Sequence, residues 1–124
     1  MILIADDFES EIDLLEKILF ELGIDKDNIK IARDGKQAME LINLEHFEHL
    51  ITDYNMPFFN GSEVIITAQK AGISKILLRS SHSVSRLRQN LEDYKINPTG
   101  IELVGKRDTN LAELKELIKK FIIS

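Results

Sequence analysis

The most informative stretch of this sequence is residues 50–61, which read Leu50-Ile51-Thr52-Asp53-Tyr54-Asn55-Met56-Pro57-Phe58-Phe59-Asn60-Gly61. A short apolar run that ends in an acid is typical of a strand buried in a parallel sheet. Pro57 and Gly61 are turn-forming residues, so a loop is expected to follow the strand. The stretch therefore predicts a buried strand that presents Asp53 at its carboxyl end.

The same pattern recurs on both sides of this stretch. Short apolar runs predict four more strands, at residues 2–5, 28–32, 75–79 and 101–104. Apolar residues at helical spacing predict a helix after each strand, with Asp34 capping the second helix and Asp108 or Thr109 capping the last. Strict alternation of strands and helices predicts an α/β domain with a parallel sheet, right-handed crossovers and helices on both faces.

The composition fits one globular domain over residues 1–124, with 44% hydrophobic and 30% charged residues. The chain has no cysteine, which excludes disulfides, thiolate metal sites and cysteine nucleophiles. A net charge of −5 argues against broad contact with nucleic acid or with an anionic membrane. The apolar runs are too short to span a bilayer. We expect a cytoplasmic protein.

Polar side chains follow four of the five predicted strands. Asp6-Asp7 follows the first strand, Asp53 the third, Ser80-Ser81 the fourth and Lys106 the fifth. The carboxyl ends of parallel strands meet at one edge, so these groups should lie together. Two carboxylates about 5 Å apart repel by roughly 3 kcal/mol at an effective dielectric constant of 20. One lysine does not offset three acids, whereas Mg²⁺, which prefers oxygen ligands, does.

This set of groups suits phosphoryl transfer to a carboxylate. Asp53 would attack phosphorus and form an acyl phosphate. The metal and Lys106 would neutralise the phosphoryl oxygens, and Ser80 would donate a hydrogen bond to one of them. Each residue alone is more often a solvated loop residue. The functional interpretation depends on their coincidence at one edge of the sheet.

These motifs resemble those of the response-regulator receiver domain, and the resemblance covers the whole chain. They are the opening Leu3-Ile4-Ala5-Asp6-Asp7-Phe8, the acid of residues 50–61 followed by Met-Pro and Gly, and the lysine after the fifth strand. The resemblance, to single-domain regulators of the chemotaxis type, implies a flavodoxin-like, doubly wound (βα)5 fold with strand order 2-1-3-4-5.

The resemblance also implies a role for each acid. Asp53 matches the phosphorylated aspartate, which also binds the metal. Asp7 matches the direct metal ligand, and Asp6 the acid that acts through a water molecule. Asn55 matches the position whose main-chain carbonyl binds the metal. The implied cofactor is Mg²⁺.

Three further positions are implied to control the phosphoryl group. Ser80 matches the switch hydroxyl that moves toward it, and Lys106 matches the lysine that pairs with it. Asn55 and His82 match positions that tune its lifetime. A histidine kinase or phosphotransfer protein would be the donor, and a downstream protein the target. Apart from its own phosphorylation and dephosphorylation, the chain is expected not to be an enzyme.

The sequence departs from the family on the output side. Arg107 replaces the usual proline after the lysine, and Leu103 replaces the signalling aromatic residue. Arg79 stands where an apolar residue is usual, so it must pair with an acid or reach solvent. It also leaves open which serine of Ser80-Ser81 is the switch. The segment 83–100 is longer than is typical.

Three other functions compete with the phosphoacceptor. A phosphorylation-independent, receiver-like binding module is compatible with Arg79 and Arg107. A haloacid-dehalogenase-type hydrolase requires Asp-x-Asp, whereas Asp6 and Asp7 are adjacent. A flavodoxin requires a Ser/Thr/Gly-rich phosphate loop, whereas Asp6-Asp7-Phe8-Glu9 would repel a phosphate. The chain could be free-standing or the receiver end of a longer kinase.

Two pairs of residues have no predicted chemistry. We expect at least one of Phe58 and Phe59 to belong to the core. His46 and His49 lack metal-binding spacing and are expected at the surface or at a strand edge.

Overall fold

The computed structural model describes residues 1–124 and confirms the predicted fold class. Five strands form one parallel sheet in the order β2-β1-β3-β4-β5. The strands are β1 (Ile2–Ala5), β2 (Ile29–Ala32), β3 (His49–Asp53), β4 (Lys75–Ser80) and β5 (Ile101–Gly105). The helices are α1 (Glu9–Glu21), α2 (Gly35–Leu44), α3 (Gly61–Lys70), α4 (Val84–Asp93) and α5 (Leu111–Ile123), with a 3-10 turn, η1 (Lys26–Asn28), before β2.

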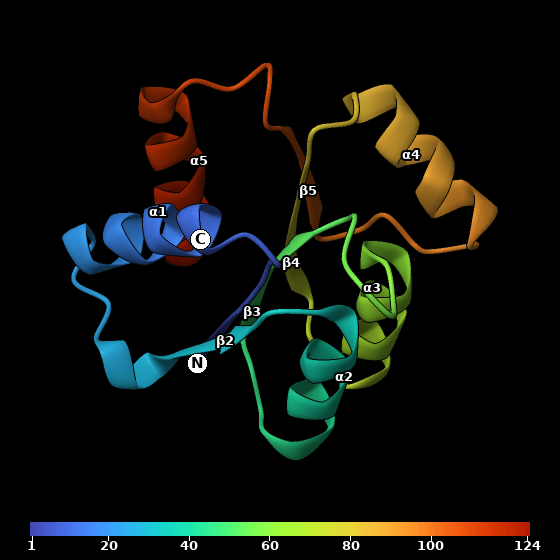
Figure 1. Ribbon diagram of the computed structural model, residues 1–124, viewed down its shortest axis with the longest axis horizontal. Helices are drawn as coiled ribbons and strands as arrows, with labels where there is room; N and C mark the ends of the chain where they lie inside the picture. Colours follow the sequence, from blue (N-terminus) through green and yellow to red (C-terminus); the bar gives the residue numbers. More distant parts are fainter.

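The helices cover both faces of the sheet, α1 and α5 on one side and α2, α3 and α4 on the other (Figure 1). Each face therefore has its own apolar layer. Leu50 of β3 packs in the layer beneath α2 to α4, and Ile51 packs in the layer beneath α1 and α5. Both side chains are almost fully buried, and each burial stabilises the fold by roughly 1.5–3 kcal/mol. This two-sided burial explains why β3 is continuously apolar instead of alternating.

Side chains at the helix starts fix where the helices begin. Asp34 caps α2 by accepting a hydrogen bond from the amide of Gln37, as predicted. The predicted cap of the last helix was wrong: Asn110, not Asp108 or Thr109, accepts from the amide of Glu113. The reason is a turn after β5, in which the amide of Asp108 bonds to the carbonyl of Gly105. This turn moves the start of α5 along the chain.

The strand register aligns the residues that matter for function. Asp53 lies opposite Arg79 of β4, and Ser80 lies opposite Gly105 of β5. Asp6 and Lys106 directly follow β1 and β5, so both belong to the same edge of the sheet. No helix combines the length and the apolar character needed to cross a bilayer.

Candidate active site at the carboxyl edge of the sheet

Three acids meet at the carboxyl ends of β1 and β3. Each of Asp6, Asp7 and Asp53 offers a carboxylate oxygen that lies within 4.8 Å of those of the other two. Asp6 is 2% exposed and Asp53 is 5% exposed, whereas Asp7 faces solvent. The structure thus brings together the acids that the sequence predicted, two of them largely withdrawn from water.

Backbone amides and one lysine hold the two buried acids. The amide of Phe8 donates to Oδ1 of Asp6 at 3.0 Å, and the amide of Tyr54 donates to Oδ1 of Asp53 at 2.8 Å. Nζ of Lys106 lies 3.5 Å from Oδ2 of Asp6 and 3.5 Å from Oδ2 of Asp53. The lysine bridges the acceptor strand and the first strand, as expected from its place after β5.

The electrostatics of the site are unbalanced toward negative charge. Burial raises the pKa of Asp53 to about 6, even though Lys106 and the amide of Tyr54 oppose the rise. The charges of Asp6 and Asp7 contribute to this rise. Burial also raises the pKa of Asp6. One lysine therefore does not neutralise the cluster, and three converging carboxylates are the ligand type that a hard divalent cation prefers. The residues present fit such a cation.

Asp53 opens into a cavity of about 390 Å³. Besides Asp53, the cavity is lined by residues from the loops after β1, β3, β4 and β5 and from the first turn of α1: Phe8, Ser10, Glu11, Asn55, Ser81 and Lys106. These side chains therefore surround the space in which a small anionic group would meet the acceptor carboxylate.

The two serines after β4 have different surroundings. Ser80 is buried, and its Oγ accepts a hydrogen bond from the amide of His82 at 3.2 Å. Its carbonyl accepts from the amide of Lys106 at 2.7 Å. Ser81 is exposed and lines the cavity. The predicted switch residue is thus buried and does not line the cavity, whereas its neighbour lies on the cavity wall.

Asn55 and His82, the two positions that the resemblance implies tune the lifetime of the phosphoryl group, are in contact. Nδ2 of Asn55 lies 3.0 Å from Nε2 of His82. The imidazole also meets the ring of Tyr54 edge-on, with ring centroids 6.5 Å apart. This contact joins the loop after β3 to the loop after β4 beside the acceptor.

Arg79 pairs with an acid that the sequence had not identified. Its side chain is buried, and Nη1 donates to Oε2 of Glu11 in α1 at 2.9 Å. The signal in the sequence was a charge inside the apolar strand 75–79. The partner could not be found from the sequence because it lies 68 residues earlier in the chain.

The predicted core role for Phe58 or Phe59 was wrong. Phe58 is 75% exposed and Phe59 is 36% exposed. Phe58 has a φ of 72°, a left-handed conformation that is rare for a bulky residue. Tyr54 fills the core position of this loop instead. The two rings therefore lie at the surface near the acceptor edge. His46 is exposed and His49 lies half-buried at the start of β3, as expected.

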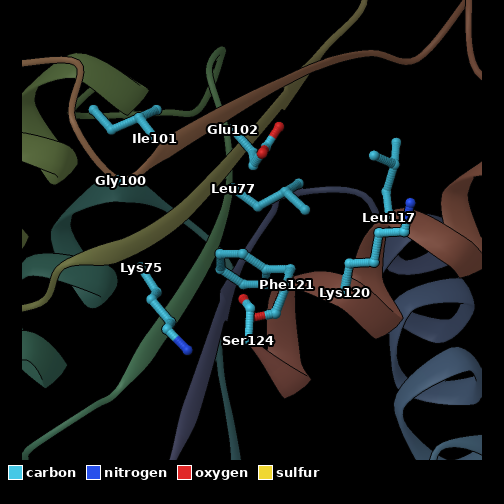
Figure 2. Close-up of a pocket in the computed structure, with 9 residues that line it drawn as sticks. All are labelled: Lys75, Leu77, Gly100, Ile101, Glu102, Leu117, Lys120, Phe121 and Ser124. Atoms are coloured by element: carbon cyan, nitrogen blue, oxygen red, sulfur yellow. The ribbon is translucent and has the colours of Figure 1, made fainter.

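A second cavity, of about 500 Å³, lies far from these acids. It is formed by the amino-terminal parts of β4 and β5 and by the last turns of α5, with Leu77 and Phe121 at its centre (Figure 2). It contains none of the predicted site residues. The acceptor edge, not this larger cavity, is the candidate active site.

Comparison with curated proteins gives two partial matches. The sensor protein EvgS of Escherichia coli (strain K12) is 44% identical over 63 residues, which are 51% of this chain and 5% of EvgS. The chemotaxis protein CheY of Pseudomonas aeruginosa is 34% identical over 64 residues, which are 52% of this chain and 50% of CheY. The matches thus span half the length of CheY and a small part of EvgS.

Solved structures match over nearly the whole chain. The response regulator TrrA of Thermotoga maritima, in complex with Mg²⁺-BeF, is 30% identical with a TM-score of 0.75, covering 97% of this chain and 96% of TrrA. A two-component transcriptional regulator of Clostridium phytofermentans is 25% identical with a TM-score of 0.77, covering 98% of this chain and 91% of that regulator's chain.

Residues 2–98 match the family described as the response regulator receiver domain. The matched residues include the three acids and both serines. The match ends before β5, so it does not include Lys106 or Arg107. The chain belongs to the response regulator receiver domain family.

Proposed function

We propose that this receiver domain accepts a phosphoryl group from a phosphohistidine donor on Asp53, with Mg²⁺, and signals by binding another protein. The observation that carries the proposal is the site itself. A buried aspartate with a pKa of about 6 lies at the base of a cavity, beside two more acids and one lysine. Such an excess of buried negative charge is a cost to stability that phosphorylation chemistry explains.

The residues that would hold Mg²⁺ are Asp7 and Asp53 directly, the main-chain carbonyl of Asn55, and Asp6 through a water molecule. The cation would supply positive charge for the acids and for the phosphoryl oxygens. Two facts support this assignment: the carboxylate oxygens converge within 4.8 Å, and TrrA, 30% identical, was solved with Mg²⁺-BeF.

The chain's own residues would perform the transfer. An oxygen of Asp53 attacks phosphorus, the P–N bond of the donor phosphohistidine breaks, and the imidazole leaves with the electron pair of that bond. With a pKa of about 6, Asp53 is ionised at neutral pH and is a stronger nucleophile than an ordinary carboxylate. Lys106, 3.5 Å from Oδ2, would stabilise the oxygens of the acyl phosphate. Attack of water on phosphorus would later release phosphate and restore the carboxylate.

We assign the switch hydroxyl to Ser80, which must exchange its bond with the amide of His82 for a phosphoryl oxygen. Its carbonyl accepts a hydrogen bond from the amide of Lys106, so a shift of Ser80 would move the backbone of the lysine. The Asn55–His82 contact would tune the lifetime of the acyl phosphate by limiting the approach of water.

The donor is proposed to be a histidine kinase or a phosphotransfer protein, and the output a protein partner in the cytoplasm, in keeping with membership of the receiver family. Beyond its own phosphorylation and dephosphorylation, we propose no enzymatic activity. The alternative is a phosphorylation-independent binding module. It is favoured by Arg79 and Arg107, which depart from the family pattern.

One experiment separates the two functions. The protein is incubated with Mg²⁺ and acetyl phosphate, and its intact mass is measured beside that of Asp53→Asn. A gain of one phosphoryl group in the wild type alone supports the phosphoacceptor. No gain with Mg²⁺ present would favour the phosphorylation-independent module. Ser80→Ala and Ser81→Ala test the switch assignment in a separate titration with beryllofluoride and Mg²⁺, followed by the backbone amide NMR signals of His82 and Lys106. Only the Ser80 variant should lose the shift of these signals on binding.

A further inference from the structure

The Arg79–Glu11 ion pair is the feature of the site that the proposed function leaves unexplained. Arg79 is 5% exposed, and Nη1 donates to Oε2 of Glu11 at 2.9 Å. Its Nε is buried and has no hydrogen-bond partner. A buried donor without a partner destabilises the state that contains it, because the group has lost its hydrogen bonds to water. This guanidinium therefore retains a donor for which the present state of the site offers no acceptor.

The sheet places the backbone of Arg79 beside that of the acceptor. Asp53 and Arg79 are opposite each other on neighbouring strands, which lie about 4.8 Å apart in a sheet. Ile51 and Leu77, two residues earlier on the same strands, pack in the layer beneath α1 and α5. Because side chains alternate along a strand, Asp53 and Arg79 also belong to this face. A phosphoryl group on Asp53 would add its oxygens on the side of the sheet where Arg79 lies.

Glu11 links the arginine to the cavity. Its side chain is 28% exposed and lines the same cavity as Asp53 and Lys106. Arg79 is not among the lining residues. In the unphosphorylated protein, the carboxylate of Glu11 at the cavity wall thus forms an ion pair with the guanidinium of Arg79. A phosphoryl group carries more negative charge than a carboxylate, and guanidinium groups bind phosphoryl oxygens in a bidentate manner.

We propose that Arg79 is a second phosphoryl-binding cation, stored on Glu11 in the unphosphorylated protein and transferred to the phosphoryl group when Asp53 is modified. This inference rests on the proposed phosphorylation of Asp53. Glu11 is then a positioning residue that competes for the arginine. Its release on phosphorylation breaks the side-chain link between β4 and the first turn of α1.

The test measures beryllofluoride binding by calorimetry in the presence of Mg²⁺. Glu11→Gln weakens the hold on Arg79, so the affinity should rise about fivefold. Arg79→Met should lower it about tenfold, the value of one charge-assisted hydrogen bond. In the Arg79→Met background, Glu11→Gln should change the affinity less than about twofold, because no arginine is left to release. The side-chain Nε–H signal of Arg79 in NMR spectra should shift on binding.

A matched control is present on the same helix. Glu9 pairs with Arg33 at 3.1 Å, and both side chains are exposed. Glu9→Gln makes the same chemical change outside the cavity and should leave the affinity unchanged. Circular dichroism melts establish that each variant is folded, and methionine suits position 79 because β4 is otherwise apolar there.

Three outcomes would overturn the inference. If Glu11→Gln raises the beryllofluoride affinity as much in the Arg79→Met background as in the wild type, Glu11 acts only by repelling the anion. An equal effect of Glu9→Gln would show a general response to charge. Unchanged affinity of Arg79→Met would show that the arginine is only structural. If the wild type itself shows no binding that depends on Asp53, the proposed function fails, and this inference fails with it.

Discussion

Asp53→Asn is expected to stabilise the protein at neutral pH when divalent cations are absent. The pKa of Asp53 rises from 3.8 to about 6 on folding, chiefly because of burial. The folded state therefore binds this proton more tightly than the unfolded state does. The stabilisation that the protonated Asp53 gives to the folded state is fully present below pH 3.8 and is lost as the pH rises through 6. With about 1.36 kcal/mol for each pKa unit, the ionised carboxylate costs about 3 kcal/mol at pH 7.5.

The assay is urea unfolding followed by circular dichroism, in EDTA, at pH 7.5 and at pH 4.5. Asparagine removes the charge and keeps the shape, so the free energy of unfolding should rise by about 3 kcal/mol at pH 7.5. With a denaturant slope of about 2 kcal/mol per molar, the midpoint rises by about 1.5 M. At pH 4.5 the folded wild type is protonated, and the gain should shrink to about 1 kcal/mol.

The exposed Asp13 provides the control, because Asp13→Asn removes one carboxylate from the solvated face of α1. It should change the free energy of unfolding by less than about 0.5 kcal/mol at either pH. Two results would refute the reasoning about Asp53. One is an Asp53→Asn variant no more stable than the wild type at pH 7.5. The other is a gain that is equally large at pH 4.5.

Three further predictions concern single contacts. Lys106→Met should raise the pKa of Asp53 above its wild-type value, because the lysine is the largest influence that lowers it; carboxyl ¹³C titration measures this, and an unchanged value would contradict it. Asn110→Ala should lower the free energy of unfolding in urea by about 1 kcal/mol, through loss of the α5 cap. Asn110→Asp should retain most of the stability, because aspartate also caps helices. Gly35→Ala should destabilise the protein by about 2 kcal/mol or more in thermal melts, because the added Cβ would clash with the carbonyl oxygen of Phe59. An unaltered melting temperature would show that this loop yields easily.

The elements and their order were predictable because each strand is a short apolar run and each helix has apolar residues at regular spacing. Strand ends then located Asp6, Asp53 and Lys106 without knowledge of any contact. The α5 cap was mispredicted because Asp108 is an equally good capping residue by type. Only the turn that bonds Asp108 to Gly105 decides that Asn110 is used.

What could not be predicted depends on contacts between distant parts of the chain. The Arg79–Glu11 pair joins β4 to α1, and no local pattern relates these two residues. Phe58 has an exposed ring and a left-handed backbone conformation, and composition reveals neither. The two serines after β4 are alike in sequence, and only their surroundings in the fold distinguish Ser80 from Ser81.

The position of Lys106 on the sheet affects the fraction of time for which the lysine lies beside Asp53. β5 is an edge strand that pairs with β4 alone. Native proteins open locally, one structural unit at a time, with free energies below that of global unfolding. An opening that frees β5 and α5 would carry Lys106 away from Asp6 and Asp53 while the other four strands stay paired. Amide hydrogen exchange along β5 therefore measures how often the acceptor lacks its lysine.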